Sequence, residues 1–409
     1  MCLQRSASGA VTAQGEEAGF AGKWLEVVSR VDASFGGISA LMPQLCESAT
    51  AAGTQVSIAA FCFAREDTYD IERQGVPFCR FPLGTMRWRR GMECRKRLAA
   101  LLQVCEGVHI HGIWDEHCAL SGAMARSAHK PYIVSAHGML DRWAIRHKWL
   151  KKRLYSLFVE STNLRKATCL HALTRAETAD YRRYGLKNPI AMIPNGVDVP
   201  STAVPEMFLE QYPQLKNKRI VLFLSRMHYK KGLDILCKAW TAASAKFPEA
   251  HLVLAGPDCD NIRSVIQRRV EELGIGATVS FTGMLRGAMK WSALSAAELF
   301  VLPSYSEGFS VAVLEAMGMG VPVLISRPCN FPEVAEEGCG LVIDPTARDL
   351  QEALFWLLSA NSSELAKMGS RGRKLVASRF TWSAIGHQIA ELYNWVSGGP
   401  KPTLFPVFE

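Results

Sequence analysis

The stretch S-Y-S-E-G-F-S-V-A-V-L-E-A-M-G-M-G-V-P-V, residues 304–323, decides the fold. It follows the apolar run 299–302, which is typical of a buried strand, and after a short polar loop it becomes an apolar helix near Ser310. Glycines end this helix, and the apolar run 323–325 predicts the next strand. A strand, a helix and a second strand in this order indicate a parallel β-α-β unit.

Two carboxylates lie within this stretch in an E-x7-E spacing, Glu307 in the loop and Glu315 inside the helix. The backbone amides of Gly308, Phe309 and Ser310 would lie at the open helix N-terminus, where unpaired donors and the helix dipole favour an anion. A phosphate at these amides, with sugar hydroxyls at the two acids, suggests a sugar nucleotide as ligand. An ordinary strand-loop-helix unit with surface acids is the alternative interpretation.

The composition is that of a globular chain, with 48% hydrophobic and 21% charged residues among 409. This length allows two domains, each with its own core. No apolar run is long enough to predict a membrane-spanning helix. The 12 cysteines form no C-x-x-C pair, which favours reduced thiols in a cytoplasm. Residues 1–22 are small and polar, which predicts a disordered tail.

Short apolar strands alternate with longer amphipathic segments along both halves of the chain, which implies doubly wound parallel sheets. The stretch I-P-N-G-V-D at 193–198 is typical of a turn, and a segment rich in proline and polar residues follows it. The last helix, 382–396, carries an apolar stripe. The predicted division is a tail (1–22), a first domain (23–198), a linker (199–218), a second domain (219–381), and a terminal helix with a tail (382–409).

The predicted strands of the first domain cover residues 24–28, 55–62, 108–111 and 132–136, with a helix over 38–52. Those of the second domain cover residues 220–224, 251–254, 278–281, 299–302 and 323–325, with a helix from about Leu233.

Two basic residues, Arg226 and Lys231, lie in the loop S-R-M-H-Y-K-K-G that follows the first strand of the second domain. Open α/β sheets bind ligands at the carboxyl ends of their strands. Two fixed cations at that edge could neutralise a departing nucleoside diphosphate. A solvated basic loop is the alternative, and we expect the neighbouring Lys230 to be exposed.

These motifs resemble those of the retaining glycosyltransferases of family 4, the glycosyl transferases group 1. The resemblance extends over residues 23–396 and rests on four motifs in the family's order: the glycine pair Gly36-Gly37, the dipeptide His137-Gly138, R-x4-K-G at 226–232 and E-x7-E at 307–315. It implies an α/β fold of the GT-B architecture, in which two doubly wound Rossmann-like domains face a cleft. The C-terminal helix would return to the first domain.

The resemblance also implies the donor site. Glu307 and the amides after it would hold the donor sugar and the β-phosphate, while Glu315 would hold the ribose. Strand-ending turns at Gly256 and Gly283 would border the nucleoside, although plain turns remain the alternative for them and for the glycine pair. The implied donor-binding residues are Gly36, Gly37, Arg226, Lys231, Gly256, Gly283, Met284, Glu307, Gly308, Phe309, Ser310 and Glu315.

His137 follows a predicted strand and would face the cleft. The family carries a histidine in this position, close to the reacting carbon of the donor sugar, although a structural histidine is the alternative. The resemblance thus implies four catalytic residues: His137, Arg226, Lys231 and Glu307. On the acceptor side we place His111, Asp115 and His137.

A zinc site built from His109, His111 and His117 is a weaker hypothesis. The first two histidines lie at i and i+2 on a strand end, and no cysteine or carboxylate set completes a plausible geometry in the sequence. We therefore expect no metal and no other cofactor.

Other protein classes fit parts of the sequence. An NAD(P)-dependent oxidoreductase would carry G-x-G-x-x-G after the first strand, whereas only Gly318-Met319-Gly320 approximates it, and that precedes a strand. A basic membrane- or nucleic-acid-binding module without catalysis would explain the positive first half but not a complete donor site. A GT-B sugar-nucleotide epimerase also fits, and a product assay would separate it.

We therefore expect a retaining, metal-independent, hexosyltransferase-type glycosyltransferase (EC 2.4) that uses a nucleoside-diphosphate sugar as co-substrate. The resemblance implies a glycan or lipid-linked glycan acceptor, in polysaccharide, lipopolysaccharide or other cell-surface glycan biosynthesis. We expect no nucleic-acid partner. The expected location is cytoplasmic, with peripheral contact to the inner face of the cytoplasmic membrane as a further hypothesis.

That hypothesis rests on the charge of the first half, in which residues 1–200 hold 26 lysines and arginines against 18 acids. Residues 142–158 interleave basic side chains with tryptophan, leucine and phenylalanine, and a second basic stretch covers 86–97. Basic and apolar residues at helical spacing suit the surface of an anionic membrane. A helix that packs its aromatic face on the core is the alternative.

The membrane hypothesis predicts that the protein co-sediments with vesicles only when they contain anionic lipid. Binding should fall as salt rises, because the attraction is electrostatic and screened. It should also weaken when Arg146, Lys148, Lys151 and Lys152 are replaced by glutamate. Equal sedimentation with neutral and anionic vesicles at low salt would contradict the hypothesis and favour an acceptor that is not membrane-bound.

Overall fold

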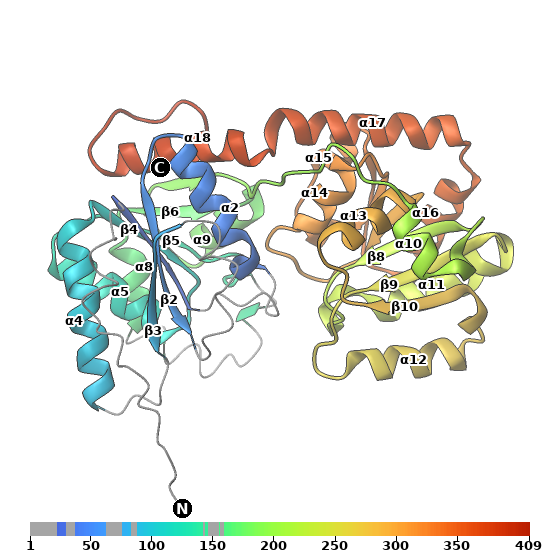
Figure 1. Ribbon diagram of the computed structural model, residues 1–409, viewed down its shortest axis with the longest axis horizontal. Coiled ribbons are helices and arrows are strands. Elements are labelled where there is room, and N and C mark those ends of the chain that lie inside the picture. The colour runs from blue at the N-terminus through green and yellow to red at the C-terminus, as the bar shows by residue number, and fades with distance from the viewer. Residues whose placement is uncertain are drawn as a thin grey trace, which may run out of the picture.

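The computed structural model describes residues 23–29, 37–62, 76–82, 88–141, 144–145, 155 and 159–409. Two α/β domains lie side by side, and the last two helices run along the top of both (Figure 1). Each domain is built on one sheet, in the orders β14-β7-β6-β5-β4-β1-β2-β3 and β10-β9-β8-β11-β12-β13. Non-consecutive neighbours at the centre of each sheet are typical of doubly wound folds, so the two predicted doubly wound domains are confirmed.

The first sheet is parallel except at its edge, where β14 pairs antiparallel with β7. Its strands are β1 (Trp24–Val28), β2 (Val56–Cys62), β3 (Phe78–Pro82), β4 (Gly107–His111), β5 (Tyr132–Ser135), β6 (Cys169–Ala172), β7 (Ile190–Met192) and β14 (Val407–Phe408). The helices of this domain are α2 (Ile38–Ala51), α4 (Trp88–Val104), α5 (Glu116–Ser127), α8 (Ser161–Arg165) and α9 (Arg175–Arg183).

The second sheet is parallel throughout. Its strands are β8 (Arg219–Leu224), β9 (Ala250–Ala255), β10 (Val279–Gly283), β11 (Leu299–Leu302), β12 (Val323–Ser326) and β13 (Gly340–Ile343). Its helices are α10 (Glu206–Gln211), α11 (Leu233–Lys246), α12 (Ile262–Glu272), α13 (Gly287–Ala296), α14 (Val311–Gly318), α15 (Glu333–Glu336), α16 (Ala347–Ser359) and α17 (Ser362–Arg379). Central strands such as β9 and β11 are fully buried because helices cover both faces, which explains their continuous apolar sequences.

The predicted elements agree closely with the structure. Strand 24–28 and the terminal helix 382–396 have the predicted bounds, as β1 and α18 (Trp382–Val396). The segment 199–218, predicted as a linker, contains helix α10. Its Phe208 is buried in the core of the second domain, and the Phe208 amide donates to Ser292 Oγ at 3.0 Å.

Helix α18 returns to the first domain and packs against α2 and the sheet (Figure 1). Tyr393 of α18 stacks on Trp24 of β1 with ring centroids 4.2 Å apart. Gly386 permits the close approach to α2, because a Cβ at this position would lie 2.3 Å from the carbonyl oxygen of Ser48. Within the described ranges, no helix is both long enough and apolar enough to cross a membrane.

Candidate active site

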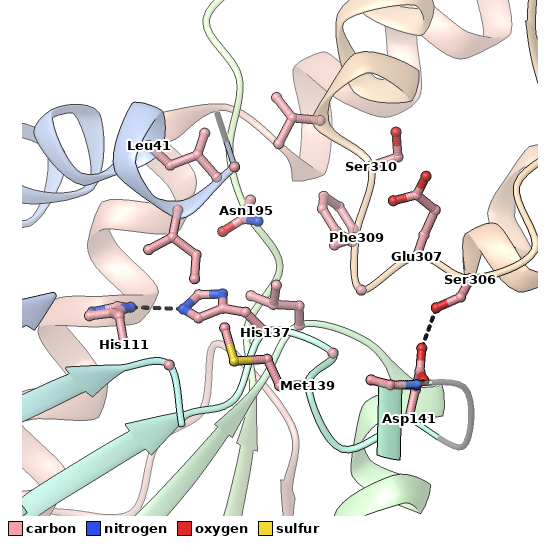
Figure 2. Close-up of a pocket in the computed structure, with 18 of the residues that line it drawn as sticks. Leu41, His111, His137, Met139, Asp141, Asn195, Ser306, Glu307, Phe309 and Ser310 are labelled. Atoms are coloured by element: carbon pink, nitrogen blue, oxygen red, sulfur yellow. Dashed lines mark hydrogen bonds between the residues drawn. The ribbon is translucent and has the colours of Figure 1, made fainter. Parts of the chain in front are cut away.

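A cavity of about 810 Å³ lies between the two domains at the carboxyl ends of both sheets. Its lining includes the last residue of three strands: Val28 of β1, His111 of β4 and Leu224 of β8. Figure 2 shows His111 and His137 on the first-domain side, facing Glu307, Phe309 and Ser310 across the cavity. This is the edge at which open α/β sheets bind ligands.

The centre of the second-domain wall is a buried ion pair between Lys231 and Glu307. Lys231 ends a short 3₁₀ turn (Tyr229–Lys231) after β8, and Glu307 lies in the loop before α14. Glu307 Oε1 also accepts from Ser304 Oγ at 2.7 Å. Burial would raise the pKa of Glu307, but the neighbouring Lys231 and Lys230 together hold it below its usual value. Glu307 is therefore anionic, as an acceptor for hydroxyl groups requires.

Two further cations, Arg226 and Lys230, line the same wall. Within the described residues the Arg226 guanidinium makes no hydrogen bond or ion pair, so its donors remain available to a ligand. Lys230 was expected to be exposed, and this prediction is wrong. It is half-buried, and burial lowers its pKa. The wall therefore carries three cations in place of the predicted two.

The loop from Ser306 to Ala312 also lines the cavity and ends at the N-terminus of α14. The amides of Gly308, Phe309 and Ser310 donate to no partner in the part of the chain that the structure describes. Unpaired amides at a helix N-terminus attract anions. These amides directly follow Glu307, the partner of Lys231, so the predicted binding of a phosphate here stays a prediction that the geometry permits.

The two domains touch at a pair of glycines, Gly138 and Gly308. A Cβ on Gly138 would lie 2.7 Å from the Cα of Gly308, so the backbones meet directly. Beside them the Ser306 hydroxyl donates to the Asp141 carboxylate across the cavity, as the dashed line in Figure 2 shows. The floor of the cleft is thus closed by contacts between the domains.

His137 adopts a left-handed backbone conformation with φ of 52°, which is rare for a residue with a side chain. The turn is held by hydrogen bonds from both sides: the Ala136 amide donates to the Tyr181 hydroxyl at 2.8 Å, and the Gly138 amide donates to Glu177 at 2.6 Å. The ring of His137 lies 2.9 Å from His111 through Nε2. Burial lowers the pKa of His137 well below its usual value, so the ring is neutral.

Asp115 and Gly37 also line the cavity, on the first-domain side. Asp115 is the N-cap of α5, where its side chain accepts from the His117 amide at 2.9 Å. Burial would raise its pKa, but hydrogen bonds from His117 and Ser29 lower it. Gly37, with φ of 61°, precedes α2, whereas Gly36 lies outside the described residues.

The predicted nucleoside end of the site is not part of this cavity, whose lining excludes Gly256, Gly283, Met284 and Glu315. The two turns lie together, since the Gly256 amide donates to the Gly283 carbonyl at 2.7 Å. Glu315 accepts from Lys290 Nζ at 2.6 Å, so a ribose hydroxyl would share this carboxylate with a lysine.

The structure adds residues that the motifs do not reveal. Glu177 holds the His137 turn, and Asn195 lines the cavity from the segment that leaves the first domain. Glu26 of β1 lies within hydrogen-bonding distance of His111, which corrects the expectation that no carboxylate accompanies the histidines. Glu26, His109 and His111 together form a group that could hold a metal ion. The sequence itself contains one indication that Glu26 has a special role, since an acid inside the apolar strand W-L-E-V-V is unusual.

Comparison with known proteins places both halves of the chain in glycosyltransferase families. Residues 36–196 match the glycosyl transferase 4-like domain, and residues 206–375 match the glycosyl transferases group 1. The chain is 28% identical over 296 residues to the GDP-mannose-dependent alpha-(1-6)-phosphatidylinositol monomannoside mannosyltransferase of Mycolicibacterium smegmatis, covering 68% of this chain and 73% of that one. It is 29% identical over 316 residues to the alpha-maltose-1-phosphate synthase of the same organism, covering 71% and 79%.

Solved structures share the fold. Sucrose-phosphate synthase from Thermosynechococcus elongatus superimposes with a TM-score of 0.71 at 21% identity, over 91% of this chain and 98% of that one. HepE of Anabaena, solved in complex with UDP and glucose, superimposes with a TM-score of 0.75 at 18% identity, over 91% and 100%. Both family matches and both folds agree with the motifs, and the chain therefore belongs to the family 4 glycosyltransferases of GT-B architecture and is a hexosyltransferase-type enzyme.

Proposed function

We propose that this enzyme is a retaining, metal-independent glycosyltransferase. It transfers a sugar from a nucleoside diphosphate to a glycan or lipid-linked glycan, in polysaccharide or cell-surface glycan biosynthesis. The observation that carries the proposal is the second-domain wall, where Arg226, Lys230 and Lys231 stand beside the unpaired amides before α14. This arrangement concentrates positive charge where a diphosphate leaves.

The three cations supply the charge that a divalent metal ion supplies in other glycosyl transfers. Lys231 is already fixed by Glu307, so it needs little rearrangement when a phosphate binds beside it. The Arg226 guanidinium can form two parallel hydrogen bonds to phosphate oxygens. These residues support departure of the nucleoside diphosphate without a metal ion.

Retention is the outcome that the family resemblance implies, and the state of the carboxylates that line the cavity favours same-face attack over a double displacement, which would also retain configuration. A double displacement would need a carboxylate free to attack the anomeric carbon. Glu307 is paired with Lys231, Asp141 accepts from Ser306 and from the Ala144 amide, and Asp115 caps α5. In the reaction we propose, the bond from the anomeric carbon to the phosphate breaks on the face where the acceptor oxygen attacks, and the leaving β-phosphate oxygen takes the acceptor proton.

On the opposite wall, the neutral His137 ring faces the cavity. A neutral imidazole can accept a hydrogen bond from a sugar hydroxyl at one nitrogen. We assign His137 to donor-sugar orientation, with His111 and Asp115 toward the acceptor.

The names of several relatives support a lipid-linked acceptor at a membrane surface. One relative acts on phosphatidylinositol monomannoside, and a structural neighbour, WaaG, is involved in lipopolysaccharide biosynthesis. We propose a similar acceptor class here, reached from the cytoplasmic face of the membrane by peripheral contact. The basic stretch 142–158, which would make this contact, lies almost entirely outside the described residues.

The proposed function is tested by incubating the purified protein with UDP-, GDP- and ADP-sugars and an acceptor library, with detection of nucleotide release and NMR of the product. One donor should be consumed, and the anomeric configuration of the new linkage should match that of the donor. An inverted linkage would contradict retention, and interconversion of donor sugars without transfer would identify an epimerase.

Replacement of Lys231 tests the role of the ion pair. Lys231→Ala should lower kcat/KM by about tenfold to a thousandfold, the range expected for one electrostatic stabiliser. Lys230→Ala should have a smaller effect, because Lys230 lines the same wall without pairing to Glu307. Lys238→Ala, at an exposed position of α11, is the matched control and should leave kcat/KM unchanged. Equal losses in all three variants would contradict the assignment.

Replacement of the two acids of the E-x7-E motif should change different kinetic constants, KM for one and kcat for the other. Glu315→Gln should raise KM for the donor by about tenfold with kcat retained, because a ribose contact exists in both ground and transition states. Glu307→Gln should lower kcat by about tenfold or more, because its partner is the reacting sugar. Glu271→Gln on exposed α12 is the control. A kcat defect confined to Glu315→Gln would mean that the two roles are exchanged.

A further inference from the structure

A continuous chain of hydrogen bonds runs through the first domain from the cavity to the end of β7. Its members are His137, His111, Glu26, Tyr393, His109, Ser135, His171 and the carbonyl group of Ile193. Apart from the contact between Tyr393 and Glu26 Oε1, the distances run from 2.6 to 2.9 Å. From His111 inward every side chain is buried.

The donor and acceptor of each hydrogen bond are fixed from the inner end of this hydrogen-bonded chain, because the Ile193 carbonyl can only accept. His171 Nε2 lies 2.8 Å from this oxygen and must donate to it. Burial lowers the pKa of His171 to about 4, so the ring is neutral and its Nδ1 must accept. The group that donates to it is Ser135, whose Oγ lies 2.7 Å away.

The donor in each hydrogen bond nearer the cavity follows in the same way. Ser135 has one proton, so its Oγ must accept from His109 Nε2 at 2.7 Å. Burial lowers the pKa of His109 well below its usual value, and this neutral ring then accepts at Nδ1 from the Tyr393 hydroxyl at 2.8 Å. Burial also raises the pKa of Tyr393, so the hydroxyl keeps the proton that it donates.

With these assignments, no group yet supplies a hydrogen for the contact between Tyr393 and Glu26. Four histidine rings, Ser135 and Tyr393 supply the protons for six of the seven hydrogen bonds in the chain. The Tyr393 proton is already used toward His109. An unprotonated Glu26 would therefore face a hydroxyl oxygen with no hydrogen between them, which is costly in a buried position.

We propose that Glu26 carries the seventh proton toward Tyr393 and acts as a positioning residue for His137. With Oε1 as donor, Oε2 of Glu26 remains an acceptor for His111 Nε2 at 2.6 Å. His111 then accepts at Nδ1 from His137 Nε2, 2.9 Å away. The second nitrogen of His137, Nδ1, is left as an acceptor for a sugar hydroxyl. This inference rests on the proposed function, because the hydroxyl belongs to the donor sugar.

The alternative occupant of this cluster is a metal ion, since Glu26, His109 and His111 place potential ligand atoms close together. The distances favour the hydrogen-bonded chain. Two ligands of one tetrahedral zinc ion lie about 3.3 Å apart, given metal–ligand bonds of about 2.0 to 2.1 Å. His111 Nε2 and Glu26 Oε2 are only 2.6 Å apart, which is a hydrogen-bond distance.

The decisive variant is Glu26→Gln. A protonated carboxyl group donates at one atom and accepts at the other, and an amide does the same in the same shape. Glu26→Gln should therefore keep kcat/KM within about threefold of the wild type. Glu26→Leu removes both bonds and should lower kcat/KM by about tenfold to a hundredfold, as loss of a buried hydrogen-bond partner does.

Donor analogues that each lack one hydroxyl distinguish positioning from general damage. One analogue should be a poor substrate for the wild type and for Glu26→Gln, whereas Glu26→Leu should no longer discriminate against it. A uniform loss with every analogue in Glu26→Leu would contradict the positioning role.

Infrared difference spectroscopy between the wild type and Glu26→Gln reads the proton directly and requires neither activity nor a folded Glu26→Leu variant. The wild type should show the carbonyl band of a neutral carboxylic acid. The proposal would be overturned by a carboxylate band in its place or by equal activity losses in Glu26→Gln and Glu26→Leu. It would also be overturned if the wild type bound one equivalent of metal that Glu26→Gln lacks. Absence of transfer from any nucleotide sugar by the wild type would instead contradict the proposed function and leave the infrared result unaffected.

Discussion

The ion pair between Lys231 and Glu307 is the interaction on which the donor site depends. Both side chains are more than nine-tenths buried, with 8% of the surface of each exposed, so neither charge could remain there without the other. The pair joins the turn after β8 to the loop before α14, and thereby places three cations beside the amides of that loop. In the proposed reaction a diphosphate would meet charges that are already oriented, as electrostatic stabilisation of a leaving group requires.

The first domain meets this wall through a backbone that is equally constrained. Direct contact between Gly138 and Gly308 closes the floor of the cleft, and the left-handed turn at His137 presents its ring to the cavity. Behind the ring, the hydrogen-bonded chain through Glu26 reaches Tyr393 on α18. The terminal helix therefore does more than cover the first sheet, since it supplies a buried hydroxyl to the network that contacts the His137 ring.

Much of this arrangement could be predicted from the sequence, because its signals are local. Buried strands such as β11 are continuous apolar runs, and Arg226, Lys231, Glu307 and the amides after it lie in short motifs whose spacing places them together. The remainder depends on tertiary contacts that no local pattern encodes. Helix α10 in the predicted linker packs through Phe208 into the core of the second domain. Lys230 is half-buried in the wall of the cavity between the domains. Glu26 gains its role only when β1, β4 and α18 meet.

The central claim is that protein cations alone hold the nucleoside diphosphate. Isothermal titration of UDP, GDP and ADP into the enzyme, in EDTA and again with magnesium, tests it most directly. We expect one nucleotide to bind with the same affinity in both buffers, and this affinity to fall as salt rises, because the contacts are charge pairs. Binding that appears only after a divalent cation is added would contradict the account.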